Sequence, residues 1–258
     1  MKSEQETVDV IVAGGGTAGH VAAIQAARAG AKTSIIEAGS MLGGTMTAGG
    51  VYMPNHFFSI DRPVVQGIAW ELYTKSKEVE GLPVPDYKKR RPLDTPGYYS
   101  YINVPVYAAL AEEEAVLAGV AVHFHEFIDD VTADGDYWEV TSRGRGVQRR
   151  TRAREIIDCT GDADVVRILG METLRGSTRQ PGAYQYKIEG IEHEQLWEKE
   201  VQQIFDEALA AGDLEEGDFA YARTRPFSYY LAHGGHNATH VYDADTSDAD
   251  GQTRANLD

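Results

Sequence analysis

The chain has 258 residues, 42% of them hydrophobic, and a formal net charge of −16. This length and composition suffice for a sizeable hydrophobic core, in one large domain or two small ones. The acidic excess disfavours nucleic acid and anionic membranes as partners. There is no apolar run of about 18 residues, so no membrane span is predicted, and the polar N-terminus predicts no signal peptide. We therefore expect a cytoplasmic protein, and the single cysteine, Cys159, fits a reducing compartment because it permits no internal disulfide.

Residues 8–37 predict a dinucleotide-binding strand–helix–strand unit. An apolar strand over 8–13 leads into glycines with G-x-G-x-x-G spacing, and an Ala-rich helix precedes a second apolar strand that ends on Glu37. Gly14 would permit the tight turn, Gly16 the close approach of a pyrophosphate, and Gly19 the packing of helix on strand. Glu37 would accept hydrogen bonds from the adenosine ribose hydroxyls, and its charge would repel a 2′-phosphate. The cofactor contacts predicted here are Gly14, Gly16, Thr17, Ala18, Gly19, Glu37 and Ala38.

A second glycine-rich segment, AGSMLGGTMTAGGV, follows Glu37. Its small residues are what a loop would need in order to wrap a bulky flat cofactor, and an NAD-binding domain has no need of such a loop here. An ordinary loop is the alternative. The predicted cofactor contacts in this segment are Gly43, Gly44, Thr45 and Thr47.

The segment IIDCTGDADVVRILG, residues 156–170, predicts an apolar strand, a tight turn and a helix. Glycine in the turn would allow a ligand to approach closely, and Asp162 or Asp164 would cap the helix. A capped strand-to-helix junction without a ligand is the alternative interpretation.

Together these segments resemble the FAD-dependent oxidoreductases of the glutathione-reductase-like fold. Within that fold the chain is most similar to a bacterial family with a glycine-rich loop, LGG-x-x-T-x-GG and D-x-T-G-D-A-D; the resemblance covers residues 8–190 well and the remainder loosely. It implies that FAD is the cofactor, that Ile128 lies against adenine, and that Thr160, Gly161 and Asp162 lie beside the pyrophosphate and ribose. It also implies that a substrate C–H bond delivers hydride to flavin N5.

Aromatic- and proline-rich residues in 51–105, and residues 227–240, are expected to line the substrate pocket. His56 and His236 are candidate polar pocket residues or bases; the catalytic residues are otherwise unassigned. His233, His236 and His240 have a spacing that suggests a metal. However, the glycines between them and the lack of a nearby cysteine or patterned carboxylate lead us to predict no metal site.

Two charged segments are interpreted as structural. Residues 188–218 predict an amphipathic surface helix with a solvated acidic face. The arginine-rich residues 143–154 suggest a phosphate-binding patch at first, but a β-hairpin with outward-facing charges fits the sequence better.

The expected fold is α/β: a Rossmann-like three-layer FAD-binding domain over residues 1–50 and 105–175, with an interleaved substrate lobe over 51–104 and 176–258. The expected function is that of a flavin dehydrogenase or oxidase of a small polar organic substrate. The alternatives are a flavin-dependent reductase of an unsaturated acid or isoprenoid, and a non-catalytic FAD-binding subunit.

The family's C-terminal strand and helix, which return to the flavin, have no counterpart after Asp162. The resemblance therefore implies a two-chain enzyme in which a second polypeptide completes the flavin site. A truncated chain or a fragment is the alternative.

Overall fold

The computed structural model describes residues 2–54, 57, 64–84, 86, 100–177, 180–188, 190, 198–215, 219, 226–232, 235–242 and 245–257. The chain divides into two compact units, Met1–Thr173 and Leu174–Asp258. Among the described helices, none has the length and apolar character needed to cross a membrane.

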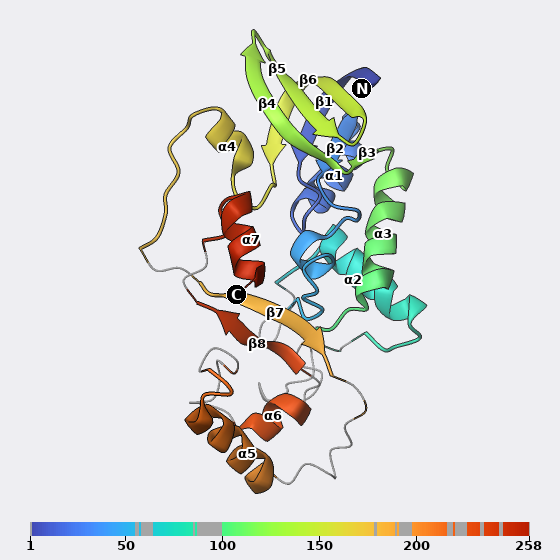
Figure 1. Ribbon diagram of the computed structural model, residues 1–258. Coiled ribbons are helices and arrows are strands. Elements are labelled where there is room, and N and C mark those ends of the chain that lie inside the picture. Colours follow the sequence, from blue (N-terminus) through green and yellow to red (C-terminus); the bar gives the residue numbers. More distant parts are fainter. Residues whose placement is uncertain are drawn as a thin grey trace. The chain divides into compact units, whose positions relative to one another are not determined.

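A six-stranded mixed sheet organises the first unit (Figure 1), with the strand order β3-β2-β1-β6-β5-β4. Neighbours among β3, β2, β1 and β6 pair in parallel, whereas β5 and β4 continue the sheet antiparallel. The strands are β1 (Lys2–Ala13), β2 (Thr33–Glu37), β3 (Ala121–Phe124), β4 (Glu126–Asp134), β5 (Tyr137–Gly144) and β6 (Val147–Asp158). This parallel-rich sheet confirms the predicted α/β, Rossmann-like class.

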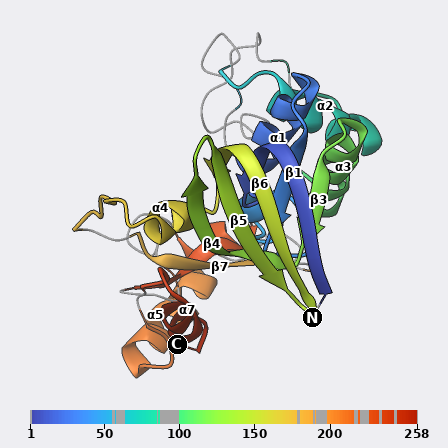
Figure 2. The same cartoon turned by 90° about the horizontal axis from the view of Figure 1, so that it is seen from above.

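Helices α1 (Gly19–Arg28), α2 (Ile68–Val79) and α3 (Val104–Leu117) share one core with β1 and β2. A second core joins the short helix α4 (Asp164–Ile168) to β4, β5 and the opposite side of β1 and β2. Figure 2 shows α2 and α3 on the side of the sheet away from α4. The sheet is thus covered on both faces, as in the three-layer arrangement expected.

Strand β1 begins at Lys2, earlier than the apolar pattern predicted, because its polar residues find partners within the sheet. The Oε1 atom of Glu6 accepts hydrogen bonds from Ser34 Oγ at 3.0 Å and Thr151 Oγ1 at 2.8 Å. Burial by itself raises the pKa of Glu6, but hydrogen bonds from His123 and Thr151 outweigh it and lower the pKa to about 2. Because the first residues of β1 are polar and pair with polar partners, this part of the strand shows no hydrophobic alternation in the sequence.

The arginine-rich segment forms the predicted β-hairpin, in which β5 pairs antiparallel with β6. Several of its arginines have partners within the sheet: Arg149 Nη2 lies 3.0 Å from Oε1 of Glu126 on β4, and the Arg152 guanidinium lies 4.1 Å from the centre of the Tyr137 ring on β5. The predicted hairpin is confirmed.

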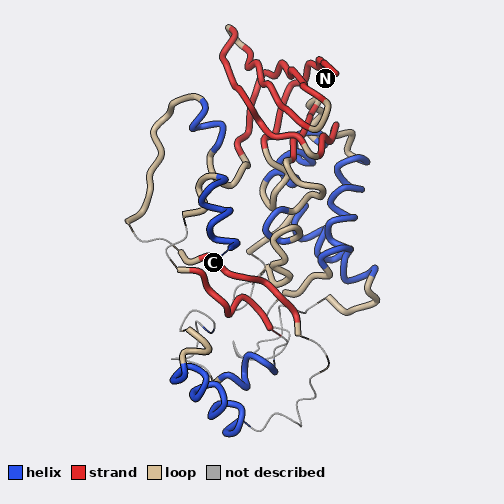
Figure 3. Tube along the Cα trace, viewed as in Figure 1, coloured by secondary structure: helices blue, strands red, loops and turns tan. Residues whose placement is uncertain are grey.

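The second unit contains the antiparallel pair β7 (Gly182–Lys187) and β8 (Gly235–Val241), together with helices α5 (Glu198–Ala211), α6 (Phe227–Ala232) and α7 (Ala249–Leu257) (Figure 3). Helix α5 confirms helical structure in the described part of the predicted acidic segment. It buries Phe205 against Phe219 and Phe227.

The unit boundary differs from the expected interleaved division. Helix α2, which lies in 51–104, packs with α1 and α3 inside the first unit. Its residues Ile68, Leu72 and Tyr73 are buried in that core. For the rest of 51–104, membership of a substrate lobe stays a prediction.

Candidate functional site

The glycine loop after β1 contains glycines of two kinds. A Cβ atom on Gly14, where φ is +92°, would lie 2.4 Å from the carbonyl oxygen of Cys159, and one on Gly19 would lie 1.9 Å from that of Gly14. Internal packing therefore requires glycine at both positions. A Cβ on Gly16 would meet only Cys159 O, at 3.9 Å. Glycine at position 16 thus leaves free space beside the loop, where a phosphate could approach the backbone.

Glu37, at the end of β2, connects two loops through its carboxylate. Its Oε2 accepts a hydrogen bond from Gly15 N and its Oε1 one from Gly39 N, both at 2.6 Å. Each oxygen of an ionised carboxylate can accept more than one hydrogen bond, so capacity remains for a ligand hydroxyl.

The second glycine-rich segment, which includes the 3₁₀ helix η1 (Gly44–Met46), packs directly on the first loop. Gly43 N donates to Gly15 O at 2.9 Å, and Thr17 Oγ1 donates to Gly43 O at 3.0 Å. A Cβ on Gly44 would lie 2.7 Å from Gly16 Cα, so the two loops meet without room for a side chain. The two predicted motifs, separate in sequence, form one surface.

The two threonines of this segment differ in their surroundings. Thr45 is exposed, whereas Thr47 is 3% exposed and its Oγ1 donates to Leu42 O at 2.7 Å. The Thr47 hydroxyl therefore donates its hydrogen bond within the loop and stabilises the loop's conformation.

The turn after β6 is organised by Asp158, which the sequence analysis did not single out. Its Oδ1 accepts hydrogen bonds from Thr160 N at 3.1 Å and Thr160 Oγ1 at 2.7 Å, and its Oδ2 accepts one from Val166 N at 3.2 Å. The expectation that Asp162 or Asp164 caps α4 is wrong: the N-cap position is Ala163, with no side-chain cap bond. Asp158 reaches the helix from the end of the strand and takes that role.

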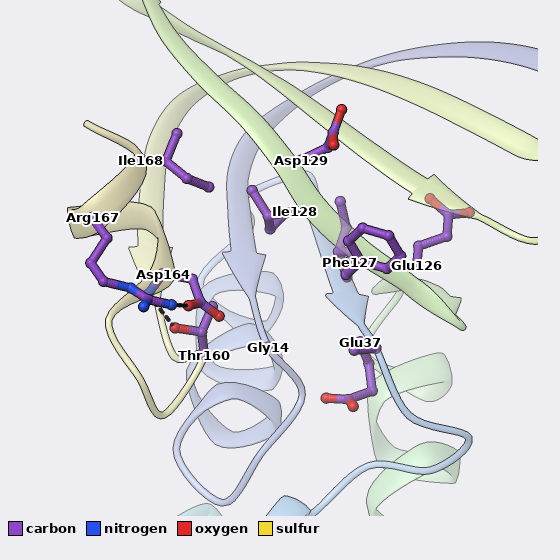
Figure 4. A pocket seen from close by; sticks show the side chains of 12 residues that line it. Gly14, Glu37, Glu126, Phe127, Ile128, Asp129, Thr160, Asp164, Arg167 and Ile168 are labelled. Atoms are coloured by element: carbon purple, nitrogen blue, oxygen red, sulfur yellow. Dashed lines mark hydrogen bonds and ion pairs between the residues drawn. The ribbon is translucent and has the colours of Figure 1, made fainter. Parts of the chain in front are cut away.

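The first glycine loop, the end of β2 and the turn after β6 border a pocket of about 570 Å³ at the carboxyl ends of β1 and β2, the usual place for a nucleotide in such sheets. Figure 4 shows Glu37 at the end of β2, Phe127 and Ile128 on β4, and Asp164 beside Arg167 on α4. Five predicted residues line the pocket: Gly14, Glu37, Ala38, Ile128 and Thr160. Seven others were not predicted: Ile36, Glu126, Phe127, Asp129, Asp164, Arg167 and Ile168.

The remaining predicted contacts lie elsewhere. Gly19 is the first residue of α1, and Gly161 and Asp162 are exposed in the turn before α4. The two joined glycine-rich segments contain the others: Gly16, Thr17, Ala18, Gly43, Gly44, Thr45 and Thr47. His56 lies outside the described residues. The backbone of His236 is in β8, opposite Tyr186, but its side chain is outside the described part. Cofactor contact at each position, and any catalytic role of the histidines, stay predictions.

Sequence reasoning also missed two buried residues beneath the first loop, His20 and Tyr107. His20 is 0% exposed and its Nδ1 lies 2.8 Å from Gly16 O; its Nε2 lies 3.3 Å from the Tyr107 hydroxyl. A polar residue directly after the third glycine, inside an otherwise apolar helix start, was the available signal.

A glycine loop between a strand and a helix, an acidic residue at the end of the next strand and a pocket at the carboxyl ends of parallel strands define a dinucleotide-binding α/β protein. More particularly, the chain belongs to the FAD dependent oxidoreductase family, whose model matches residues 9–257. FAD is therefore its cofactor, in agreement with the open space at Gly16. The family match confirms the predicted resemblance to FAD-dependent oxidoreductases.

Several solved structures are distantly similar. A myxobacterial FAD-dependent chondrochloren halogenase is 21% identical over 61% of this chain and 38% of its own, with a TM-score of 0.42. A geranylgeranyl bacteriochlorophyll reductase-like protein from Thermoplasma acidophilum is 18% identical over 65% and 43%, with a TM-score of 0.45. A flavoprotein/dehydrogenase from Cytophaga hutchinsonii is 19% identical over 67% and 44%, also with a TM-score of 0.45.

The chain thus spans less than half the length of each of these three proteins. Likenesses this distant carry no information about its substrate. No curated protein sequence matches the chain.

Proposed function

We propose that this chain belongs to a flavin dehydrogenase or oxidase that removes hydride from a small polar organic substrate. The observation that carries the proposal is the junction of the two glycine loops beside the Glu37 carboxylate and the pocket. FAD, when bound, supplies the hydride-accepting chemistry at flavin N5. The protein's own contribution is to bind and orient the nucleotide and the substrate.

In this proposal each described segment has one task. The loop around Gly16 and the adjoining Gly43–Gly44 turn would hold the pyrophosphate, because the backbone there can be approached closely. Glu37 would accept hydrogen bonds from the ribose hydroxyls. Ile128, with Phe127 next to it on β4, would provide the apolar surface for adenine.

The reaction is tested by mixing the FAD-loaded protein with a panel of small polar metabolites in the absence of oxygen. Loss of flavin absorbance with one of them, and with no nicotinamide present, is the expected result. Bleaching by NAD(P)H but by no metabolite would instead favour a reductase of an unsaturated acid or isoprenoid. A flavin that no donor reduces in the complete assembly would favour a non-catalytic FAD-binding subunit.

The participation of a second polypeptide is a separate proposal. In the proposed placement, the residues named above would hold the adenosine and pyrophosphate parts of FAD, and the resemblance described in the sequence analysis implies that a second polypeptide would complete the flavin end of the site. Light scattering of the natively purified protein tests the idea. A monomer that holds FAD tightly and turns over substrate unaided would contradict it. We also propose a cytoplasmic location, which the single cysteine supports.

A further inference from the structure

The strongest unexplained feature of the first unit is the buried imidazole of His20, one residue into α1 and directly under the glycine loop. Both the backbone N–H of His20, at 3.2 Å, and its ring Nδ1, at 2.8 Å, point at the same atom, the carbonyl oxygen of Gly16. A buried polar side chain of this size is retained only where it is hydrogen-bonded, and both ring nitrogens of His20 have partners.

The partners determine the tautomer of the ring. A carbonyl oxygen can only accept, so Nδ1 carries the proton and donates to Gly16 O. Nε2 then has a lone pair, which accepts the proton of the Tyr107 hydroxyl at 3.3 Å. Tyr107 is 1% exposed, and burial raises its pKa to about 12, so its phenol remains a donor. Burial likewise lowers the pKa of His20, which favours the neutral ring.

The bonded carbonyl belongs to the peptide group that joins Gly16 to Thr17. A peptide group is planar, and in the trans form its C=O and N–H point in opposite directions, so holding the carbonyl fixes the whole plane. On the other side of this peptide, Thr17 Oγ1 donates to Gly43 O at 3.0 Å, and Gly16 and Gly43 form a parallel β-bridge. A continuous chain of contacts therefore runs from Tyr107 on α3 through His20 to the junction of both glycine loops.

We propose that His20 is a positioning residue for FAD: its Nδ1–H holds the Gly16–Thr17 peptide in the orientation that joins the two glycine loops around the pyrophosphate. His20 itself does not touch the cofactor. This inference rests on the proposed placement of FAD at these loops.

The test compares three variants of the full chain by titrating each apoprotein with FAD. His20→Leu keeps an apolar side chain but removes the donor, and we expect the FAD dissociation constant to rise about 3- to 10-fold, as for the loss of one buried hydrogen bond. His20→Asn places an amide N–H near the position of Nδ1, and we expect it to restore the dissociation constant to within about twofold of the wild type. Tyr107→Phe keeps the Nδ1–H donor, so its effect should be smaller than that of His20→Leu.

A second readout does not depend on FAD. In the wild-type apoprotein, nitrogen-15 NMR of the imidazoles, assigned by the signal lost in His20→Asn, should show the Nδ1–H tautomer for His20. The Nε2–H tautomer, wild-type FAD affinity in His20→Leu, or an effect of Tyr107→Phe as large as that of His20→Leu would each overturn the proposal.

A Gly16→Val variant separates this proposal from the placement of FAD. If Gly16→Val binds FAD as the wild type does, FAD lies elsewhere and the site assignment fails together with the role of His20. If Gly16→Val loses FAD while His20→Leu does not, the site stands and only the role of His20 is wrong.

Discussion

The backbone N–H of Gly15 donates a 2.6 Å hydrogen bond to Oε2 of Glu37, which ties the loop after β1 to the end of β2. The acidic residue therefore shapes the glycine loop in addition to the role expected of it toward the ribose. A bond between residues 22 positions apart makes the two halves of the nucleotide-binding unit depend on each other.

Replacing Glu37 tests both roles at once. We expect Glu37→Ala to weaken FAD binding by roughly 10- to 150-fold, the range for loss of a charge-assisted hydrogen bond. The dissociation constant is measured by titration of the apoprotein. Glu113→Ala is the matched control, because it removes the same charge from an exposed position on α3. Equal affinity of Glu37→Ala and the control would contradict a role of Glu37 in binding.

Alanine substitutions at Gly16 and at Gly19 should affect different properties: FAD affinity in the first case and the stability of the fold in the second. Since a Cβ on Gly16 meets only one atom, at 3.9 Å, we expect Gly16→Ala to leave the melting temperature of the apoprotein unchanged and to lower its FAD affinity. A Cβ on Gly19 would lie 1.9 Å from Gly14 O, so Gly19→Ala should lower the melting temperature. The pair is compared by thermal unfolding without FAD and by FAD titration. Unchanged FAD affinity in Gly16→Ala would show that the space serves another purpose.

Glu6 should make the fold sensitive to acid. Its pKa is lowered to about 2 in the folded chain from an ordinary value of 4.5, so its stabilising effect is complete above about pH 4.5 and is lost as the pH falls toward 2. The side chain is only 17% exposed, and the shift corresponds to about 3 kcal/mol.

Urea unfolding between pH 2 and pH 7 measures this dependence. Wild type and Glu155→Gln, which changes an exposed glutamate of β6, should lose this contribution in acid, whereas Glu6→Gln should not. Parallel pH profiles for all three proteins would mean that Glu6 titrates normally.

Asp158 and Asp162 lie four positions apart, and replacing them should change the free energy of unfolding by different amounts. Asp158→Ala removes three hydrogen bonds to the turn and to α4, so we expect a loss of unfolding free energy of about 1–3 kcal/mol and weaker FAD binding. Asp162 is exposed, and Asp162→Ala should change stability by less than about 0.5 kcal/mol. Denaturant unfolding of both variants decides the matter; a larger loss in Asp162→Ala than in Asp158→Ala would reverse the assignment.

The strand–helix–strand unit was predictable because its signals are local. The glycine spacing, the Ala-rich helix and the apolar strand ending at Glu37 each depend on residues within a short stretch, and the structure has α1 and β2 where they were expected. The extent of β1 was not predictable in the same way. Its polar half is held by partners such as Thr151, which lies 145 positions from Glu6.

The sequence by itself determined the class of fold and the positions of the two glycine loops, because these depend on short-range backbone requirements, and its resemblance to a flavoprotein family implied FAD. Only the tertiary structure decided that the loops join at Gly16 and Gly43, that Asp158 organises the turn before α4, and that His20 and Tyr107 lie beneath the first loop. These relationships depend on contacts between residues far apart in the chain. Such contacts form only when the strands pair and the helices pack on them.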